Sequence, residues 1–201
     1  EVSGFEIGLP MNTGAEGVET AIKAIRRWGY KSKKIPPNKA EIIVADQNFH
    51  GRTTTIISFS SDKESKENFG PLTPGFKTVK FGCIDSLRSA ITENTAAVLV
   101  EPIQGEAGIV IPDPSWLPKV RELCTENNVL LILDEVQSGL GRTGKMFAFE
   151  HSLIRPDGLI LGKALGGGML PVSCFLSSKE VMQWFTPGSH GSTFGGFSLA
   201  A

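Results

Sequence analysis

The sequence predicts an α/β protein with a mainly parallel central sheet and helices on both faces. Continuous apolar runs at 96–100, 129–133, 159–161 and 172–176 have the length of strands and lack the alternation of a sheet with one wet face. Segments with helical spacing alternate with such runs, which is typical of parallel sheets. With 201 residues and 40% hydrophobic content, the chain is long enough to bury one core.

The first helix is predicted to begin at Thr13. The stretch Thr13-Gly14-Ala15-Glu16 has the spacing of a capping box, in which the side chains of Thr13 and Glu16 each accept a hydrogen bond from the other's backbone. The apolar residues that follow at helical spacing are Val18, Ile22, Ile25 and Trp28. We expect Gly29 and the basic residues after it to end this helix.

The remaining elements follow Pro36-Pro37, which interrupt the chain. Further strands are predicted at 41–45 and 78–81, helices at 84–91 and 114–127, and a polar surface loop at 58–75. The sequence contains no internal repeat and no clear domain boundary. Because it starts at Glu1 instead of Met and stops after Ala201 without a polar tail, we interpret it as a fragment of a longer protein.

Composition argues against several classes of partner and site. The net charge is −1, with acidic and basic residues interspersed, so we expect no nucleic-acid partner and no anionic membrane partner. No apolar run approaches the ~20 residues of a membrane span. Cys83, Cys124 and Cys174 are widely spaced, which indicates reduced thiols in an intracellular compartment. The 3 histidines are scattered, so no metal site is predicted.

Lys163 occupies a position typical of a reactive lysine. It follows the apolar run 159–162 and precedes a glycine-rich stretch at 166–168. A buried lysine at a strand end has a lowered pKa and a nucleophilic amine, and glycine lets backbone or a ligand approach it closely. On this motif alone, a surface lysine where a strand meets a loop is the simpler interpretation.

Other chemically versatile residues also follow predicted strands. They are Phe49, Arg52, Glu101, Asp134 and Gln137. Each alone has an ordinary explanation as a core ring, a turn cap or a solvated charge. Because ligands of parallel α/β sheets bind at the carboxyl ends of the strands, we expect these residues and Lys163 to form one site.

A phosphate-binding P-loop is a rival interpretation for residues 139–145. Their sequence, GLGRTGK, has the P-loop spacing and follows a predicted strand, which would suit a nucleotide triphosphatase. The motif needs Ser or Thr after its lysine to bind magnesium, and Met146 stands there. The acidic pair Asp134-Glu135 also lies on the strand that leads into the loop, not on a separate one. We therefore set this interpretation aside.

One cofactor accounts for the strand-end residues together. Pyridoxal phosphate needs a lysine for a Schiff base, a carboxylate at its pyridine nitrogen, a cradle for its phosphate and a flat partner for its ring. Lys163 and Asp134 meet the first two needs. The free backbone N–H groups of Gly14 and Ala15, at the start of the first helix, suit a phosphate dianion, and Phe49 offers a ring face.

Five motifs resemble those of the class III pyridoxal-phosphate aminotransferases, whose cofactor-binding large domain has the predicted fold. The motifs are 11–17 (MNTGAEG), 48–53 (NFHGRT), 100–106 (VEPIQGE), 133–139 (LDEVQSG) and 191–196 (GSTFGG). Within the family, residues 9–13 and 161–163 favour the ornithine aminotransferases. The acetylornithine and 4-aminobutyrate aminotransferases share most of these motifs and stay open as alternatives.

The resemblance implies a role for each residue around the cofactor ring. Lys163 is implied as the Schiff-base and proton-transfer lysine, and Asp134 as the partner of the ring nitrogen. Gln137 would hydrogen-bond the ring hydroxyl. Val136 and Phe49 would lie on opposite faces of the ring.

The resemblance also implies how phosphate is bound and how subunits assemble. Gly14 and Ala15 would bind the phosphate of the same subunit's cofactor. Thr193, with Ser192, would reach the phosphate in a neighbouring subunit. That role implies an obligate homodimer.

Three further residues are expected to bind substrate. Arg52 resembles the arginine that grips a substrate carboxylate, and Glu101 is placed near it by its strand end. Glu106 resembles a switch glutamate, which covers a second arginine while ornithine is bound and moves aside for 2-oxoglutarate. The implied reaction is a ping-pong transfer of the δ-amino group of ornithine to 2-oxoglutarate, giving glutamate 5-semialdehyde and glutamate.

The chain departs from the family pattern near its C-terminal end. Family members usually continue with Asn and Pro where Phe197 and Ser198 stand. The resemblance identifies residues 1–201 as the cofactor-binding large domain, without the N-terminal segment and the C-terminal small domain that carries the second arginine. A truncated, non-catalytic fragment is therefore an alternative. We expect a cytoplasmic location, with the mitochondrial matrix as the alternative.

Overall fold

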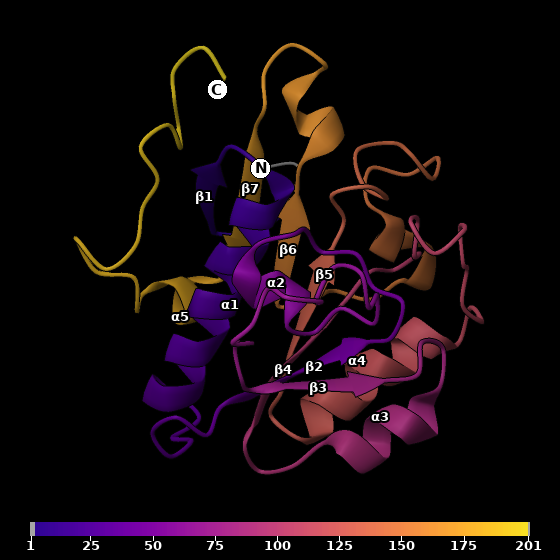
Figure 1. Ribbon diagram of the computed structural model, residues 1–201. Coiled ribbons are helices and arrows are strands. Elements are labelled where there is room, and N and C mark those ends of the chain that lie inside the picture. The colour runs from indigo at the N-terminus through magenta and orange to yellow at the C-terminus, as the bar shows by residue number, and fades with distance from the viewer. Residues whose placement is uncertain (1–2, 201) are drawn as a thin grey trace.

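The computed structural model describes residues 3–200, which form one seven-stranded sheet with helices packed against it (Figure 1). Side by side, the strands run in the order β1-β7-β6-β5-β4-β2-β3. Their bounds are β1 Ile7–Met11, β2 Glu41–Ala45, β3 Phe76–Val79, β4 Thr95–Val100, β5 Leu130–Asp134, β6 Gly158–Leu161 and β7 Ser173–Ser177.

The sheet is mainly parallel, as predicted. Strands β3, β2, β4, β5 and β6 pair in parallel, whereas β7 is antiparallel to β6 and β1 is antiparallel to β7. β1 is an additional strand that the sequence analysis did not anticipate. Its residues alternate between half-buried and exposed because it forms the edge of the sheet, so it has no continuous apolar run.

Helices cover both faces of the sheet. One face packs on α1 (Gly14–Lys31), with Val18 and Ile22 among residues such as Ile132 and Ile160. The other face packs on α3 (Ile84–Ala90) and α4 (Trp116–Glu126), where Leu131 lies in the core. Burying one such side chain contributes roughly 1.5–3 kcal/mol. Burial on both faces explains why the strand sequences are continuously apolar.

Several shorter elements complete the fold. They are α2 Thr54–Ile57, η1 Ala148–Ser152, η2 Lys163–Gly166 and α5 Lys179–Met182. No helix among residues 3–200 has both the length and the apolar content needed to cross a membrane. From residue 186 onward the chain runs along the outside of α1, where the Lys23 ammonium donates to the Ser189 carbonyl oxygen at 3.3 Å (Figure 1).

Several predicted boundaries were wrong by one or two residues, and two of them have a clear physical cause. The first helix continues past Gly29 to Lys31, because this glycine serves close packing and does not end the helix: a Cβ there would lie 3.1 Å from the Ala96 Cβ. The third strand in sequence is Phe76–Val79 and not 78–81. Its register is set by pairing with β2, in which Ile42 lies opposite Phe76.

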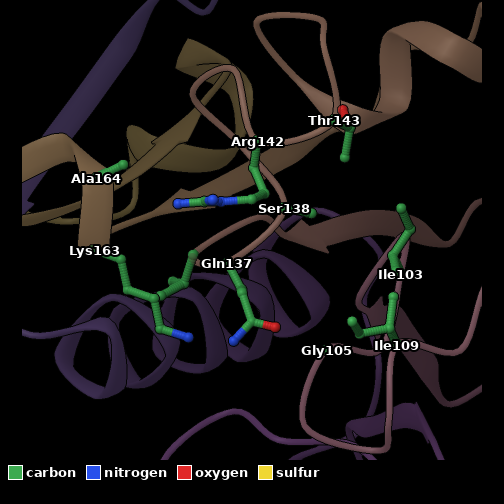
Figure 2. Close-up of a pocket in the computed structure, with 10 residues that line it drawn as sticks. Ile103, Gly105, Ile109, Gln137, Ser138, Arg142, Thr143, Lys163 and Ala164 are labelled. Carbon is green, nitrogen blue, oxygen red and sulfur yellow. The ribbon is translucent and has the colours of Figure 1, made fainter.

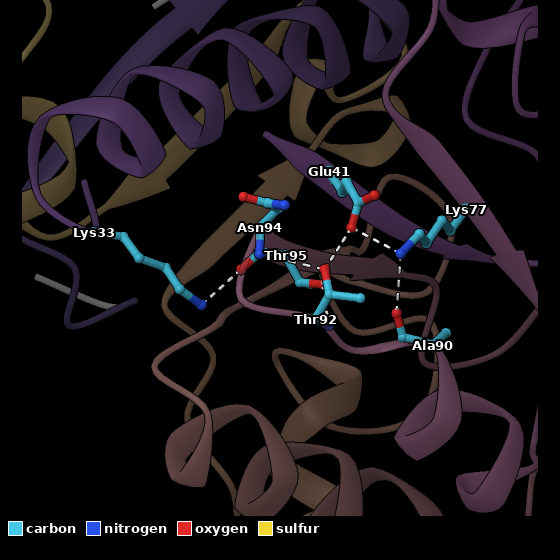
Figure 3. Close-up of polar contacts among 7 residues, drawn as sticks. All are labelled: Lys33, Glu41, Lys77, Ala90, Thr92, Asn94 and Thr95. Carbon is cyan, nitrogen blue, oxygen red and sulfur yellow. Dashed lines mark hydrogen bonds and ion pairs between the residues drawn. The ribbon is translucent and has the colours of Figure 1, made fainter. Parts of the chain in front are cut away.

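Polar side chains tie the strands together at the amino end of the sheet (Figure 3). The Glu41 carboxylate lies 2.8 Å from the Lys77 ammonium and accepts a 2.7 Å hydrogen bond from the Thr92 hydroxyl. The Lys33 ammonium donates to the Thr95 carbonyl oxygen at 2.7 Å. Partly exposed ion pairs of this kind contribute about 0–1 kcal/mol. The cavities described next lie at the opposite end of the sheet, where the parallel strands end.

Candidate active site at the carboxyl ends of the strands

A cavity of about 190 Å³ lies where β4, β5 and β6 end and α1 begins. Most of the predicted site residues line it: Gly14, Ala15, Phe49, Glu101, Glu106, Asp134, Val136, Gln137 and Lys163. They come from segments far apart in sequence, which the parallel strands bring to one edge. The structure therefore assembles the main set that the strand-end argument predicted.

Asp134 forms the inner wall together with a residue that the sequence analysis missed, His50. The Nδ1 atom of His50 lies 2.7 Å from Asp134 Oδ2, and Asp134 Oδ1 accepts a 3.0 Å hydrogen bond from the Val136 backbone N–H. Burial alone would lower the pKa of His50, but the hydrogen bond and charge of Asp134 outweigh it and raise that pKa. The imidazole thus holds the Asp134 carboxylate in one orientation.

His50 could have been noticed from its place directly after Phe49 in one of the motifs. Its side chain is completely buried. A fully buried histidine beside a carboxylate is usually a fixed hydrogen-bond partner, and the structure assigns that role here. The wide spacing of the three histidines argued only against a metal site, and it gave no information on a role as a hydrogen-bond partner. No group of three or more His, Cys, Asp or Glu side chains within residues 3–200 is arranged to hold a metal ion.

Glu101 braces the loop that carries Phe49. Its carboxylate is buried and accepts a 3.1 Å hydrogen bond from the Phe49 backbone N–H. Burial raises the pKa of Glu101 to about 7, although the neighbouring His50 charge and this hydrogen bond act in the opposite direction. Glu101 lines the cavity, and its contact in the structure is with the Phe49 backbone. Its expected contact with substrate stays a prediction.

Lys163 stands at the rim of the cavity in an unusual backbone conformation. It directly follows β6 and Gly162, and its φ of 44° lies in the left-handed region that residues with a Cβ seldom adopt. Such strain is typical of functional positions. The prediction that Lys163 is buried was wrong, because 49% of its side chain is exposed. Its ammonium lies 3.9 Å from the Glu106 carboxylate.

Gln137 and Glu106 form the outer wall. The Gln137 side-chain amide donates to Glu106 Oε1 at 2.9 Å. Gly105 makes room for this contact, since a Cβ at that position would overlap the Gln137 carboxamide. Gly105 therefore lets the Gln137 side chain pack beside Glu106.

The start of α1 provides an anion cradle. The capping box is present as predicted, with the Thr13 hydroxyl accepting from the Glu16 backbone N–H at 3.2 Å. The N–H groups of Gly14 and Ala15 have no acceptor inside the helix, and the positive end of the helix dipole lies at the same helix terminus. A Cβ on Gly14 would lie 3.0 Å from Val136 Cγ1, so the helix start packs closely against that residue.

The backbone and side chains that line this cavity fit pyridoxal phosphate. Free N–H groups suit its phosphate, a buried and oriented carboxylate suits its ring nitrogen, and a primary amine lies across the cavity from that carboxylate. Phe49, 39% exposed, and Val136 both line the space that a flat ring would need.

Three predicted residues lie away from this cavity. Arg52 lines a separate cavity of about 390 Å³ with Phe69, although its guanidinium lies 5.8 Å from the centre of the Phe49 ring. Ser192 accepts a 2.9 Å hydrogen bond from the Asn12 side chain, and neither it nor Thr193 lines a cavity with Lys163. Their expected role toward a neighbouring subunit stays a prediction.

The P-loop-like segment 139–145 does not lead into an α-helix. A short 3₁₀ turn, η1, follows it instead, and the Lys145 ammonium donates to the Glu150 carbonyl oxygen at 3.2 Å. A P-loop requires a helix start after its glycines to hold phosphate. The loop therefore lacks the structural context of a nucleotide site.

The fold and cavity thus define an α/β protein with a site for a phosphorylated ring cofactor. Residues 2–201 match the family model described as aminotransferase class-III, and the chain belongs to this family. This result confirms the resemblance inferred from the five motifs.

Individual relatives extend the comparison. The chain is 60% identical over 198 residues to an ornithine aminotransferase of Brevibacillus brevis, covering 98% of this chain and 50% of the relative. It is also 60% identical to ornithine aminotransferase 2 of Staphylococcus aureus, covering 100% of this chain and 50% of that protein. The chain therefore spans about half the length of the curated relatives it matches.

Solved structures agree in fold. The ornithine aminotransferase of Toxoplasma gondii superposes with a TM-score of 0.98 at 46% identity, covering 99% of this chain and 48% of that one. Another structure of that enzyme is described as showing partial occupancy of PLP at the active site. An acetylornithine aminotransferase of Elizabethkingia anophelis is 52% identical with a TM-score of 0.85, covering 99% of this chain and 49% of that one.

Proposed function

We propose that this chain is the cofactor-binding large domain of a pyridoxal-phosphate-dependent ornithine aminotransferase. The reaction is the transfer of the δ-amino group of ornithine to 2-oxoglutarate, giving glutamate 5-semialdehyde and glutamate. The observation that carries the proposal is the meeting of Lys163 and the buried Asp134 in one cavity beside the start of α1. The 60% identity to proteins named ornithine aminotransferase supports the choice of substrate.

Each wall of the cavity has a task in holding the cofactor. The N–H groups of Gly14 and Ala15 bind its phosphate. Phe49 and Val136 would pack against its ring. The Gln137 amide, which now donates to Glu106 at 2.9 Å, would hydrogen-bond the ring hydroxyl.

The protein's own residues then move the protons. When bound, pyridoxal phosphate supplies an electron sink for the charge left on a substrate carbon that loses its proton. Lys163 would hold the cofactor through Nζ, and once free, Nζ would remove the proton from the substrate carbon and return it. Asp134 would pair with the ring nitrogen, and His50, whose Nδ1 lies 2.7 Å from Asp134 Oδ2, holds the Asp134 carboxylate in one orientation.

Acetylornithine is the second candidate donor. The 52% identity to the Elizabethkingia enzyme exceeds the 46% identity to the Toxoplasma ornithine aminotransferase, so the two donors must be compared directly. Both enzymes would use the same proton-transfer residues. They would differ in whether the donor's far end carries a free or an acetylated amine.

The test uses the full-length protein and its Lys163→Ala variant. We expect the unchanged protein to show a visible absorption band of bound cofactor, which borohydride fixes permanently to Lys163 and which ornithine bleaches in a single half-reaction. Lys163→Ala should lose both the fixation and the bleaching, whereas the surface variant Lys145→Ala should keep them. A borohydride-fixed cofactor on another residue would disprove the assignment of Lys163. Faster bleaching by acetylornithine than by ornithine would transfer the proposal to the second donor.

The proposal includes a homodimer and a cytoplasmic location. Large apolar side chains near the C-terminal segment and after η2 are exposed, with Met169 at 86%, Phe194 at 67% and Leu199 at 76%, and such surface favours a partner subunit. Thr193 and Ser192 lie in the same segment and would complete the neighbouring phosphate site. The three cysteines are free thiols, which suits a reducing compartment. Sedimentation velocity measures the assembly, and cell fractionation the location.

A non-catalytic fragment is the remaining alternative for residues 1–201 taken alone. Its support is that the chain spans about half of its curated relatives. Cofactor binding by residues 1–201 without the ornithine half-reaction, beside an active full-length protein, would establish this alternative for the fragment.

A further inference from the structure

The C-terminal segment, residues 186–200, lies against the outside of α1 and apart from the cofactor site (Figure 1). A cavity of about 480 Å³ beside Lys163 shares Val136 and Gln137 with the smaller one, so both belong to the site already described (Figure 2). The C-terminal segment lines neither cavity. Within residues 3–200, no backbone–backbone hydrogen bond joins this segment to the sheet or to α1. Its position therefore depends on side-chain contacts.

His190 makes the central contacts between the C-terminal segment and α1. Its Nε2 atom lies 2.8 Å from the Thr20 hydroxyl oxygen, and its Nδ1 atom lies 2.8 Å from the Lys23 ammonium. The same ammonium donates to the Ser189 carbonyl oxygen at 3.3 Å. The imidazole also stacks on the Phe185 ring, with the ring centres 5.1 Å apart and an angle of 21° between the planes. One side chain thus uses both of its ring nitrogens and one ring face to hold the segment.

Ser192 makes a second set of contacts, at the start of the same helix. Its hydroxyl accepts a 2.9 Å hydrogen bond from the Asn12 side chain and donates to Glu16 Oε1 at 3.4 Å. Glu16 is the acidic member of the capping box at this helix start. The path of the segment between His190 and Ser192 is therefore fixed at both ends against α1.

The partners of His190 select one protonation state of its ring. The Thr20 hydroxyl donates its only hydrogen to the Glu16 carbonyl oxygen at 2.7 Å, so toward His190 it can only accept. Nε2 therefore carries a hydrogen. The Lys23 ammonium has donors and no acceptor, so Nδ1 must accept through its lone pair. Only the neutral imidazole, with its hydrogen on Nε2, satisfies both contacts.

Protonation of His190 would reverse the contact with Lys23. A hydrogen on Nδ1 would point at an ammonium 2.8 Å away, which removes a hydrogen bond and brings two positive charges together. The charged groups of α1 that act on His190 are Lys23 and Glu19, Phe185 is uncharged, and His190 is the only titratable residue among residues 186–200. Burial and the Lys23 charge lower the pKa of His190, and the Glu19 charge opposes them without reversing the shift.

We propose that His190 is a pH-sensitive latch, a positioning residue whose neutral ring holds the C-terminal segment on α1 and whose protonation releases it. The consequence for catalysis rests on the proposed function, in which Ser192 and Thr193 reach the cofactor phosphate of a neighbouring subunit. These two residues follow His190 almost directly in the sequence, so releasing the ring also frees them. Acid therefore weakens cofactor binding across the dimer through a residue that contacts no cofactor.

The direction of the pH effect follows from the lowered pKa. Above the ordinary histidine pKa of 6.5, the ring is neutral whether the segment is held or released, so pH has no effect on the latch. Below that pH, the released ring binds a proton that the held ring excludes, and the equilibrium moves toward release. With one proton involved, the change is at most about tenfold per pH unit, and it ends where the held ring itself becomes protonated.

Hydrogen–deuterium exchange of the C-terminal segment, measured by mass spectrometry on the full-length holoenzyme between pH 5.5 and 8, tests the latch. The main variant is His190→Gln, because a glutamine amide can donate to Thr20 and accept from Lys23 but does not titrate. After correction for the intrinsic pH dependence of exchange, protection in the unchanged protein should fall by up to about tenfold per pH unit below 6.5. Protection in His190→Gln should stay constant within about twofold. The control His151→Gln, whose ring contacts Thr143 instead, should keep the fall.

Lys23→Met is the second variant, and it decides the outcome if His190→Gln leaves the segment unprotected at every pH. It removes the ammonium that holds the neutral ring and repels the charged one. We therefore expect lower protection at pH 8 and a shallower fall below pH 6.5. A fall as steep as that of the unchanged protein in Lys23→Met, or in a His190→Gln variant that is protected at pH 8, would overturn the proposal.

Cofactor retention tests the effect on the neighbouring subunit. At pH 5.5 the unchanged holoenzyme should lose its cofactor absorption during dialysis faster than His190→Gln, by about the factor seen in exchange, whereas at pH 8 the two should agree. Equal loss at pH 5.5 would overturn the link between the latch and the neighbouring cofactor. Failure of the proposed function appears differently, as the absence of bound cofactor at pH 8 in the unchanged protein, where exchange of the segment is still measurable.

Discussion

The inner and outer walls of the first cavity differ in how they are held. On the inner wall, the His50 side chain is fully buried and that of Asp134 is 5% exposed, and the two share a 2.7 Å hydrogen bond. On the outer wall, the side chains of Lys163 and Glu106 are 49% and 52% exposed and their charged atoms lie 3.9 Å apart. The inner wall is fixed by the fold of this chain, while the outer wall is free to rearrange.

This difference follows from where the residues are attached. Asp134 is the last residue of β5, and Glu101 directly follows β4, so the sheet fixes their backbones. Glu106 belongs to a loop and Lys163 to the short η2 turn. Groups that must keep one orientation lie on the rigid side, and groups that must exchange partners lie on the mobile side, as the proposed reaction requires.

The largest effect is expected from changing the inner wall at Asp134. Asp134→Asn keeps the shape of the side chain but removes the charge that holds the proton on the ring nitrogen. We expect the ornithine half-reaction, followed by stopped-flow absorbance, to slow by about 10²–10³-fold, the cost of losing one preorganised electrostatic contact. Borohydride fixation to Lys163 should persist, because the amine is unchanged. A half-reaction within tenfold of the unchanged protein would contradict the role given to Asp134.

Much of the inner wall was predictable because it depends on strand ends. Continuous apolar runs identified the strands, and the residues after them, Asp134 and Glu101, were expected to meet in one site. The pairing of Asp134 with His50 was not predictable from one sequence, since the two residues are 84 positions apart and no local pattern links them. That contact depends on how the loop after β2 passes over the end of β5.

The outer wall was harder to predict because exposure is a property of the assembled surface. The sequence around Lys163 is apolar, which suggested burial, but β6 ends at Leu161 and the chain turns outward at Gly162. The helix start at Thr13, by contrast, was easy to predict. A capping box is local in sequence, so hydrogen bonds between neighbouring residues decide it and the prediction was correct.

A smaller effect is expected at Glu135, the buried residue that follows Asp134 in the sequence. Burial raises the pKa of its carboxyl to about 7 despite hydrogen bonds from the Ala148 and Phe149 N–H groups. The folded state therefore holds a proton that the unfolded state releases near the ordinary glutamate pKa of 4.5. Its contribution to stability is fully present below that pH and is lost as the pH rises through about 7.

Glu135→Gln tests this titration. Denaturant unfolding of the full-length protein between pH 4.5 and 8 should show a decline in the free energy of unfolding, on the order of 3 kcal/mol at most, that the variant lacks. The variant should also be less stable at low pH by about 1 kcal/mol, because one carbonyl oxygen replaces two carboxyl oxygens as acceptor. The exposed Glu122→Gln should keep the decline. An identical pH profile in Glu135→Gln would show that another group causes it.

The smallest effect on stability is expected at Glu106, on the outer wall. Glu106→Gln removes a charge that is half exposed and only 3.9 Å from the Lys163 ammonium. Because such contacts contribute little, the free energy of unfolding should change by less than about 0.5 kcal/mol. The effect should instead appear in substrate choice: without its carboxylate the rim attracts anions more strongly, so the ratio of kcat/KM for 2-oxoglutarate to that for ornithine should rise. A loss of stability as large as that of Glu135→Gln would mean that the outer wall is as tightly held as the inner one, and the division between a fixed and a mobile wall would fail.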